Sequence, residues 1–112
     1  MLIESSRVNN YLVLKIKEDL GLNSDLTELK NIITEYVDEG ITKIALEFTQ
    51  DSYLYTKSIA ILVQCCESIR EKNGTMALIN PNEDIIDILE TINFDSLIQI
   101  CDSEEKLGAG RG

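Results

Sequence analysis

Hydroxyl, thiol and carboxylate side chains could all do chemistry in this sequence, and several of the aliphatic hydroxyls gather in one stretch. The segment 51–58 (DSYLYTKS) carries aliphatic hydroxyls at Ser52, Thr56 and Ser58. A hydroxyl at the start of a helix can accept a hydrogen bond from a free backbone N–H, so Thr56 is predicted to be an N-cap residue. A phosphoryl group on such a hydroxyl would instead add a charge of about −1.5 to −2.

The sequence contains no histidine, and its three cysteines, Cys65, Cys66 and Cys101, form no C-x-x-C pair. Histidine is the commonest general base and the usual partner of a cysteine nucleophile, so the ordinary catalytic sets are missing. A zinc site would need an unusual ligand set for the same reason. We therefore expect no catalytic residues, no metal site and no cofactor, and the cysteines are predicted to be reduced, partly buried thiols.

The charge balance excludes two classes of partner. The chain has 112 residues, with 20 acidic against 10 basic side chains and a net charge of −10. Nucleic acids and anionic membrane surfaces both require clustered Lys and Arg, so neither fits this chain. No run approaches the roughly 20 apolar residues of a membrane span, and the N-terminus lacks the pattern of a signal peptide. We expect a cytoplasmic protein without membrane insertion.

Two hydrophobic periodicities predict the elements that position the segment 51–58. Apolar residues alternate with others over 42–48, which is the period of a strand. Apolar residues then recur at helical spacing over 56–73. Ile61 and Cys65 lie one turn apart on a flank of this helix, where we expect them to be half exposed. The buried stripe of the helix is predicted to be Ile59, Leu62, Val63, Cys66 and Ile69.

The rest of the chain continues the alternation of strands and helices, which predicts an α/β domain over residues 1–107 followed by a flexible tail at 108–112. Lys and Glu interrupt the apolar residues of the strands, whereas a parallel sheet covered on both faces would be continuously apolar. We therefore expect a mixed β-sheet with helices packed mainly on one face. The remaining predicted elements are a hairpin of strands 1–6 and 11–17, a helix capped by Ser24 or Asp25 and ended by Gly40, a strand at 75–79, a helix from Asn82 to Asn93, a strand at 96–101 and a terminal helix from Asp102.

Two long stretches carry a family resemblance. The first stretch, ITKIALEF, is one predicted strand. The second stretch contains, in order, a strand, Asn-Pro, a helix, a turn, a strand and an acidic start of the last helix; it reads MALINPNEDIIDILETINFDSLIQICDSEEKL. In this order the chain resembles the STAS family, the domain of bacterial anti-sigma factor antagonists, over residues 11–107. The resemblance implies the STAS fold and a binding module rather than an enzyme.

The signature loop of that family reads roughly Asp-Ser-Ser-Gly-Leu and falls on residues 55–59 (YTKSI). Tyr55 replaces the acid, Thr56 keeps a hydroxyl and Ser58 replaces the glycine. Lys57 stands where the sigma-regulating members usually have the phosphorylated serine. Thr56 and Ser58 are therefore the phosphorylation candidates, by proximity to that position.

The resemblance implies an anti-sigma factor antagonist, which binds an anti-sigma factor, often a serine kinase with an ATP pocket, and so regulates transcription. The binding face would be the signature loop and the start of the following helix. Aromatic residues are enriched in binding hot spots, which favours the tyrosines of the loop as anchors. The predicted partner-binding residues are Tyr53, Leu54, Tyr55, Thr56, Lys57, Ser58, Ile61 and Cys65.

Other interpretations remain open. The chain could be a STAS subunit of a lipid-transport complex or of a sensory scaffold, since some of those members use threonine in the loop. A small enzyme or nucleotide binder is a third interpretation from another class. The sequence also leaves the oligomeric state open, including a homo-oligomer.

Overall fold

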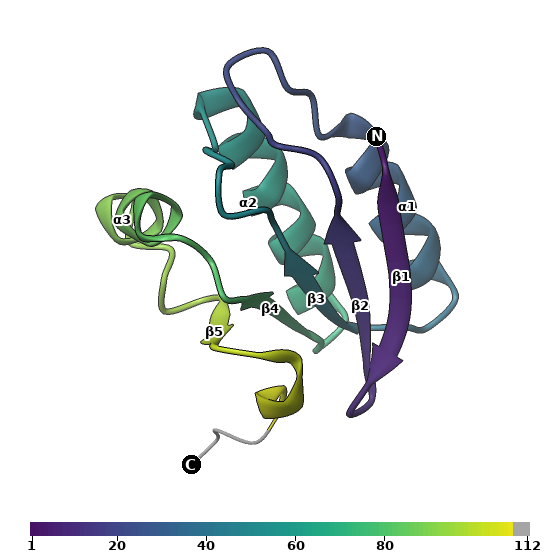
Figure 1. Cartoon of the computed structure of the whole chain (residues 1–112). Coiled ribbons are helices and arrows are strands. Elements are labelled where there is room, and N and C mark those ends of the chain that lie inside the picture. The colour runs from purple at the N-terminus through teal and green to yellow at the C-terminus, as the bar shows by residue number, and fades with distance from the viewer. Residues whose placement is uncertain (109–112) are drawn as a thin grey trace.

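The computed structural model describes residues 1–108 and shows a five-stranded sheet with three helices (Figure 1). Of the predicted flexible tail, residues 109–112 lie outside the described part of the chain. No helix of residues 1–108 is long and apolar enough to cross a bilayer. The elements are β1 (Ile3–Val8), β2 (Tyr11–Ile16), α1 (Thr27–Asp38), β3 (Lys43–Glu47), α2 (Thr56–Glu71), β4 (Thr75–Ile79), α3 (Glu83–Thr91), β5 (Gln99–Cys101) and a 3-10 turn at Glu104–Lys106.

The predicted N-terminal hairpin is confirmed. β1 and β2 pair antiparallel, with Ile3 opposite Ile16 and Val8 opposite Tyr11. Asn9 and Asn10 form the two-residue turn, and both have positive φ angles, of 52° and 71°. This is the backbone of a type I′ turn, whose twist matches that of the strands and which asparagine tolerates.

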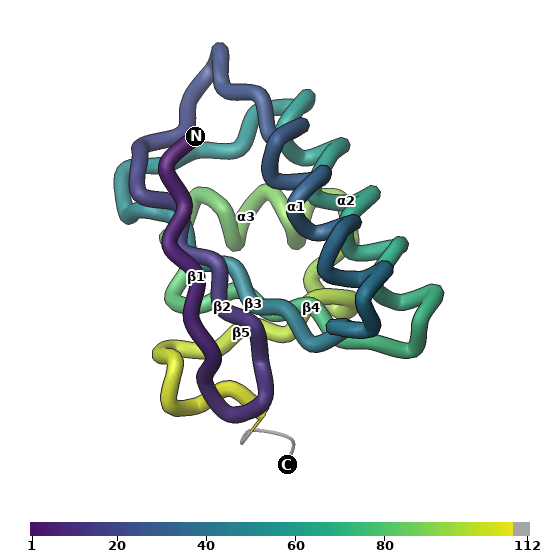
Figure 2. The backbone as a smooth tube through the Cα atoms, turned by 90° about the vertical axis from the view of Figure 1, so that its right-hand side faces the viewer, coloured from purple at the N-terminus to yellow at the C-terminus, as the bar shows by residue number. Residues whose placement is uncertain are grey.

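The sheet has the order β1-β2-β3-β4-β5, and β2 to β5 run parallel. Each parallel connection carries one helix and moves to the next strand in the same direction. Because such crossovers are right-handed, all three helices fall on the same face of the sheet. Figure 2 shows α1 and α2 side by side on one side of the strands. The predicted mixed α/β sheet, with its helices mainly on one face, is confirmed.

The main core lies between the helices and the sheet. It contains Ile33 of α1, Leu62 of α2 and Leu89 of α3, packed with Leu14 and Leu46 of the strands, and all are almost completely buried. Apolar burial of this kind contributes about 25 cal/mol per Å², so this layer supplies most of the free energy that holds the helices on the sheet.

The C-terminal turn closes the middle of the second face. Asn9 Nδ2 donates to the carbonyl oxygens of Glu105 (3.0 Å) and Leu107 (3.3 Å), and Lys15 Nζ pairs with Glu104 Oε2 at 2.6 Å. The predicted terminal helix is wrong: residues 104–106 form only a 3-10 turn, since so short a segment cannot offset helix nucleation. The turn seats Leu107 on a small apolar cluster of Tyr11, Val13, Ala45, Ala77 and Ile79.

All three helices end as their sequences predict, in a Schellman motif. Gly40, Asn73 and Asn93 each follow the C-cap residue with a positive φ angle, of 92°, 60° and 59°. After α2, the N–H of Gly74 donates to the carbonyl of Ile69 at 2.9 Å, which is the bond that defines the Schellman motif.

Candidate docking site

The segment 51–58 lies where the parallel strands end. The loops that follow β2, β3 and β4 meet at this edge of the sheet, and the β3–α2 loop leads directly into α2 (Figure 1). In open α/β sheets, the carboxyl ends of the strands are the usual place for a binding site.

Hydrogen bonds fix the β3–α2 loop on the loop that precedes α1. Ser52 Oγ accepts from the N–H of Leu20 at 2.9 Å, and the N–H of Tyr53 donates to the carbonyl of Leu20, also at 2.9 Å. Thr49 Oγ1 donates to Asp19 Oδ1 at 2.6 Å. Ser52 is 3% exposed, so its hydroxyl supports the loop from within and does not face a partner.

Asn82 joins the same loop to α3. Its Oδ1 accepts from the N–H of Ile85 at 2.9 Å, which confirms the predicted N-cap. Its Nδ2 donates to the carbonyls of Ser52 (2.7 Å) and Gln50 (3.0 Å). One side chain therefore holds the start of α3 against the β3–α2 loop.

The accessible part of the predicted site is centred on Tyr55. Its side chain is 42% exposed and meets the ring of half-buried Tyr53 edge to face, with the ring centroids 4.7 Å apart. Thr56 and Lys57 follow at the start of α2 and are exposed. The pKa of Asp25 is lowered by hydrogen bonds from Thr27 and further by the positive charge of Lys57. Aromatic, hydroxyl and ammonium groups therefore share one rigid surface.

Two predicted helix caps are wrong by one or two residues. Tyr55, not Thr56, is the N-cap residue of α2, and it makes no side-chain cap bond. Leu26, not Ser24 or Asp25, precedes α1. Asp25 Oδ1 instead accepts from the N–H of Thr27, two residues on, so its carboxylate closes a turn just before the helix. Thr56 is left with a hydroxyl that is free of the capping role predicted for it.

Three of the predicted contact residues are buried. Leu54 is 1% exposed, Ser58 1% and Cys65 2%. Leu54 belongs to the main core, and Ser58 lies on the face of α2 that packs on the sheet. The hydroxyl of Ser58 is therefore inaccessible to a modifying enzyme in this conformation. Its small side chain fits a position where the helix approaches the sheet.

One flank of α2, with Ile61 and Cys65, was predicted to be half exposed. In the structure this flank faces α1. Ile61 is half-buried there and packs against the main core, and Lys30 of α1 is close enough to Cys65 to act on its pKa. Lys30 Nζ also donates to Gln64 Oε1 at 2.9 Å, which links the two helices directly. Cys65 therefore has a packing role, and the exposure predicted for it is wrong.

Burial of Cys65 makes stability depend on pH. Desolvation raises the pKa of this thiol from 9.0 to about 11. The folded state therefore favours the protonated thiol, and its stabilising effect is complete below pH 9 and is lost between pH 9 and about 11. The urea concentration at the midpoint of unfolding is expected to fall as the pH rises from 9 to about 11. This fall should be smaller in a Cys65→Ala variant than in the wild type. Parallel curves for the two proteins would contradict this assignment.

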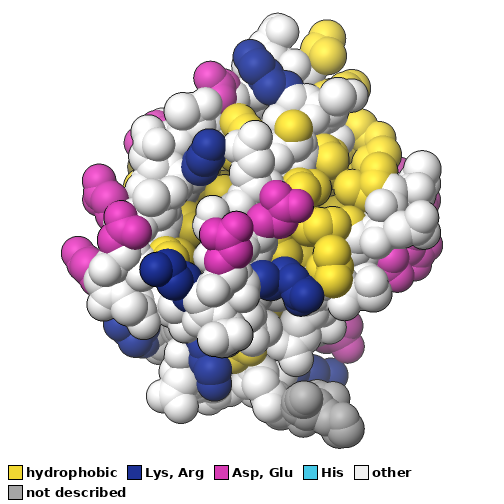
Figure 3. Space-filling view, turned by 180° about the vertical axis from the view of Figure 1, so that it is seen from behind, with side chains coloured by type: hydrophobic (Ala, Val, Ile, Leu, Met, Phe, Trp, Pro, Cys, Tyr) yellow, Lys and Arg dark blue, Asp and Glu magenta, His cyan; other side chains and the backbone are white. Residues whose placement is uncertain are grey.

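The structure adds three residues that the sequence did not indicate as part of the site: Ile59 of α2, which was predicted only as part of the buried stripe, and Ile88 and Ile92. Ile88 and Ile92 of the α3 region face α2 and, with the loop, line an open hollow of about 250 Å³. We call this the apolar groove, and its residues are Tyr53, Leu54, Tyr55, Thr56, Ile59, Ile88 and Ile92. Figure 3 shows hydrophobic side chains gathered on the helix-covered face, toward its right-hand side. Ile88 and Ile92 are one helical turn apart, but only the placement of α3 shows that they face the loop.

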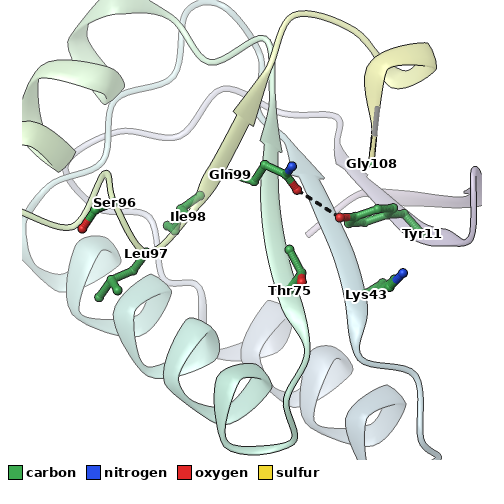
Figure 4. Close-up of a pocket in the computed structure, with 8 residues that line it drawn as sticks. All are labelled: Tyr11, Lys43, Thr75, Ser96, Leu97, Ile98, Gln99 and Gly108. Carbon is green, nitrogen blue, oxygen red and sulfur yellow. Dashed lines mark hydrogen bonds between the residues drawn. The ribbon is translucent and has the colours of Figure 1, made fainter. Parts of the chain in front are cut away.

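A second hollow, of about 460 Å³, lies on the other face of the sheet and contains none of the predicted site residues (Figure 4). It is lined by Lys43 and Thr75 at the start of two strands, and Tyr11 Oη donates to Gln99 Oε1 across it at 3.0 Å. Its lining residues include no carboxylate and no thiol, and its titratable side chains are Tyr11 and Lys43.

The fold is that of a small α/β domain, and its family can be named. The sequence pattern of the STAS domain matches residues 3–107, so the chain belongs to the STAS domain family.

Individual relatives agree with the family. A protein of Thermotoga maritima named as a candidate anti-sigma factor antagonist is 25% identical over 96 residues, which cover 86% of this chain and 85% of that protein. Its counterpart in Thermotoga neapolitana is 24% identical over the same length. The crystal structure of the T. maritima protein superposes with a TM-score of 0.80 at 23% identity, covering 94% of this chain and 90% of that one. Phosphorylated SpoIIAA, a Bacillus cell fate determinant, superposes with a TM-score of 0.69 at 12% identity, covering 98% and 100%.

Proposed function

We propose that this protein is an anti-sigma factor antagonist that binds an anti-sigma factor of the ATP-binding serine kinase type and thereby releases a sigma factor. The observation that supports this most directly is the exposed surface of Tyr55, Thr56 and Lys57 at the position of the family signature loop. Relatives named as candidate antagonists, which the chain matches over most of its length, support the same role.

The hydrogen bonds that order the loop favour binding of a partner. Hydrogen bonds of Ser52, Tyr53 and Asn82 hold the loop in place without a ligand. A surface that is already ordered loses little conformational entropy when a partner binds. The exposed tyrosine can therefore contribute most of its contact energy to affinity.

Binding is expected to depend on the exposed part of the loop. A Tyr55→Ala, Thr56→Glu double variant should lose at least tenfold in affinity for the anti-sigma factor, because it removes an aromatic anchor and adds a negative charge. Isothermal titration calorimetry with a candidate anti-sigma factor from the same genome measures this. A Leu2→Ala variant, which changes a side chain that is 64% exposed outside the loop, is the matched control. Equal affinities for the double variant and the wild type would reject the proposal.

Thr56 is the proposed phosphorylation site. Its side chain is exposed at the first residue of α2, a position where a phosphate would be favoured by the helix dipole and by neighbouring Lys57. The first turn of α2 has no acidic residue that would repel it. Incubation with the partner kinase and ATP is expected to add the mass of one phosphate to the wild type and to a Ser58→Ala variant, but not to a Thr56→Ala variant. Phosphate on the Thr56→Ala protein would place the acceptor elsewhere.

A further inference from the structure

We propose that the apolar groove between α2 and α3 binds an amphipathic helix of the partner that carries lysine or arginine beside its apolar stripe. This inference rests on the proposed function, because it assumes that the protein acts by docking. It extends the binding surface from the signature loop to α3 and states the chemistry of the segment that occupies it.

The shape of the groove fits apolar side chains of a partner. Ile92 is 40% exposed, while Tyr53 and Ile88 are only half-buried, so the groove has an apolar lining in contact with water. Its volume of about 250 Å³ is below the 300 to 1,000 Å³ typical of small-molecule sites, which favours one or two inserted side chains over a cofactor. Figure 1 shows α3 set apart from the pair of α1 and α2 and seen nearly end on.

The charge on the α3 wall of the groove selects the partner, whereas on the α2 side Lys57 follows the lining residue Thr56. The chain from Asn73 to Glu105 contains Asp and Glu but no Lys or Arg. On α3, Asp84 lies one turn before Ile88 and Asp87 lies beside it, and both carboxylates are exposed. An apolar groove with an acidic wall complements a helix that presents apolar residues at i and i+4 with basic residues next to them.

The same charge disfavours a second copy of this chain as the occupant. Each copy has a net charge of −10, and two acidic α3 walls would face one another across such an interface. Like charges brought together in this way weaken association. The groove therefore fits a partner of opposite charge better than it fits itself.

The experiment titrates the isotope-labelled full chain with a synthetic amphipathic helix of leucine and lysine, about 18 residues or five turns long. Amide shifts in NMR spectra locate the contact and give an affinity. The expected shifts are concentrated at Tyr53, Tyr55, Ile59, Ile88 and Ile92, and the same peptide with glutamate in place of lysine binds at least tenfold more weakly. Shifts spread evenly over the acidic surface would overturn the proposal.

Two matched variants separate groove binding from general attraction of a basic peptide. Ile92→Glu and Ile100→Glu make the same change at isoleucines that are 40% and 38% exposed, but only Ile92 lines the groove. Ile92→Glu is expected to weaken peptide binding at least tenfold, and Ile100→Glu to leave it within twofold. Equal effects of the two variants would overturn the proposal.

A third variant covers the case in which Ile92→Glu fails to fold. Asp84→Lys with Asp87→Lys reverses the charge of the exposed wall without touching the apolar lining. This variant is expected to lose at least fivefold in affinity for the lysine peptide, and an unchanged affinity would overturn the charge argument. None of these measurements uses the anti-sigma factor. If the peptide does not bind in the groove but the Tyr55→Ala, Thr56→Glu variant loses affinity for the anti-sigma factor, the groove proposal is rejected and the proposed function is not.

Discussion

Gly74→Ala is expected to destabilise the domain by about 3 kcal/mol, the upper end of the range for an overpacked site. A Cβ atom at this position would lie 2.2 Å from the carbonyl oxygen of Thr42 and 2.9 Å from Cγ2 of Ile69. The carbonyl oxygen of Thr42 is a backbone atom, and it already accepts a hydrogen bond from the N–H of Thr75 at 2.8 Å. The methyl group therefore forces the end of α2 away from the start of β3.

Urea unfolding followed by circular dichroism measures this effect, and Gly21→Ala is the control. A Cβ at Gly21 would meet nothing within 4 Å, and the backbone there has no positive φ angle. This variant is expected to stay within about 0.5 kcal/mol of the wild type, as surface substitutions usually do. A Gly74→Ala protein as stable as the Gly21→Ala protein would show that the contact between α2 and β3 relaxes without cost.

The ends of the helices could be predicted from the sequence because the chemistry that ends a helix is local. Gly40, Asn73 and Asn93 can take positive φ angles, and each lies two residues after the last residue of its helix. The starts of α1 and α2 depend on contacts from elsewhere in the chain. Ser52 binds the main chain at Leu20, and this tertiary bond helps to set the course of the loop before α2.

The candidate site could be predicted only in part, for a related reason. The hydroxyl and aromatic residues of the loop were visible in the sequence, and Tyr55 and Thr56 are exposed as expected. Periodicity along α2 cannot show that α1 covers the flank with Cys65, or that α3 brings Ile88 to the loop. These facts follow from the order of crossovers in the sheet.

Asn82 is the side chain whose replacement tests how rigidly the docking surface is held. Asn82→Ala removes an N-cap bond and two hydrogen bonds to the carbonyls of Gln50 and Ser52. Each loss costs about 1 kcal/mol, so the free energy of unfolding is expected to fall by about 2 to 3 kcal/mol. Chemical denaturation checks the total.

Asn82→Asp separates the cap from the bridge, and its result decides which one matters to the site. The carboxylate still accepts from the N–H of Ile85 and is favoured by the dipole of α3, but it cannot donate to the two carbonyls. If the bridge positions the loop, Asn82→Asp loses about 2 kcal/mol despite the better cap, and the amide signals of Tyr53 and Tyr55 broaden or shift while those of α1 do not. If the variant is as stable as the wild type with an unchanged loop spectrum, the loop is held by its other hydrogen bonds, which join it to Leu20, Asp19 and Asn80.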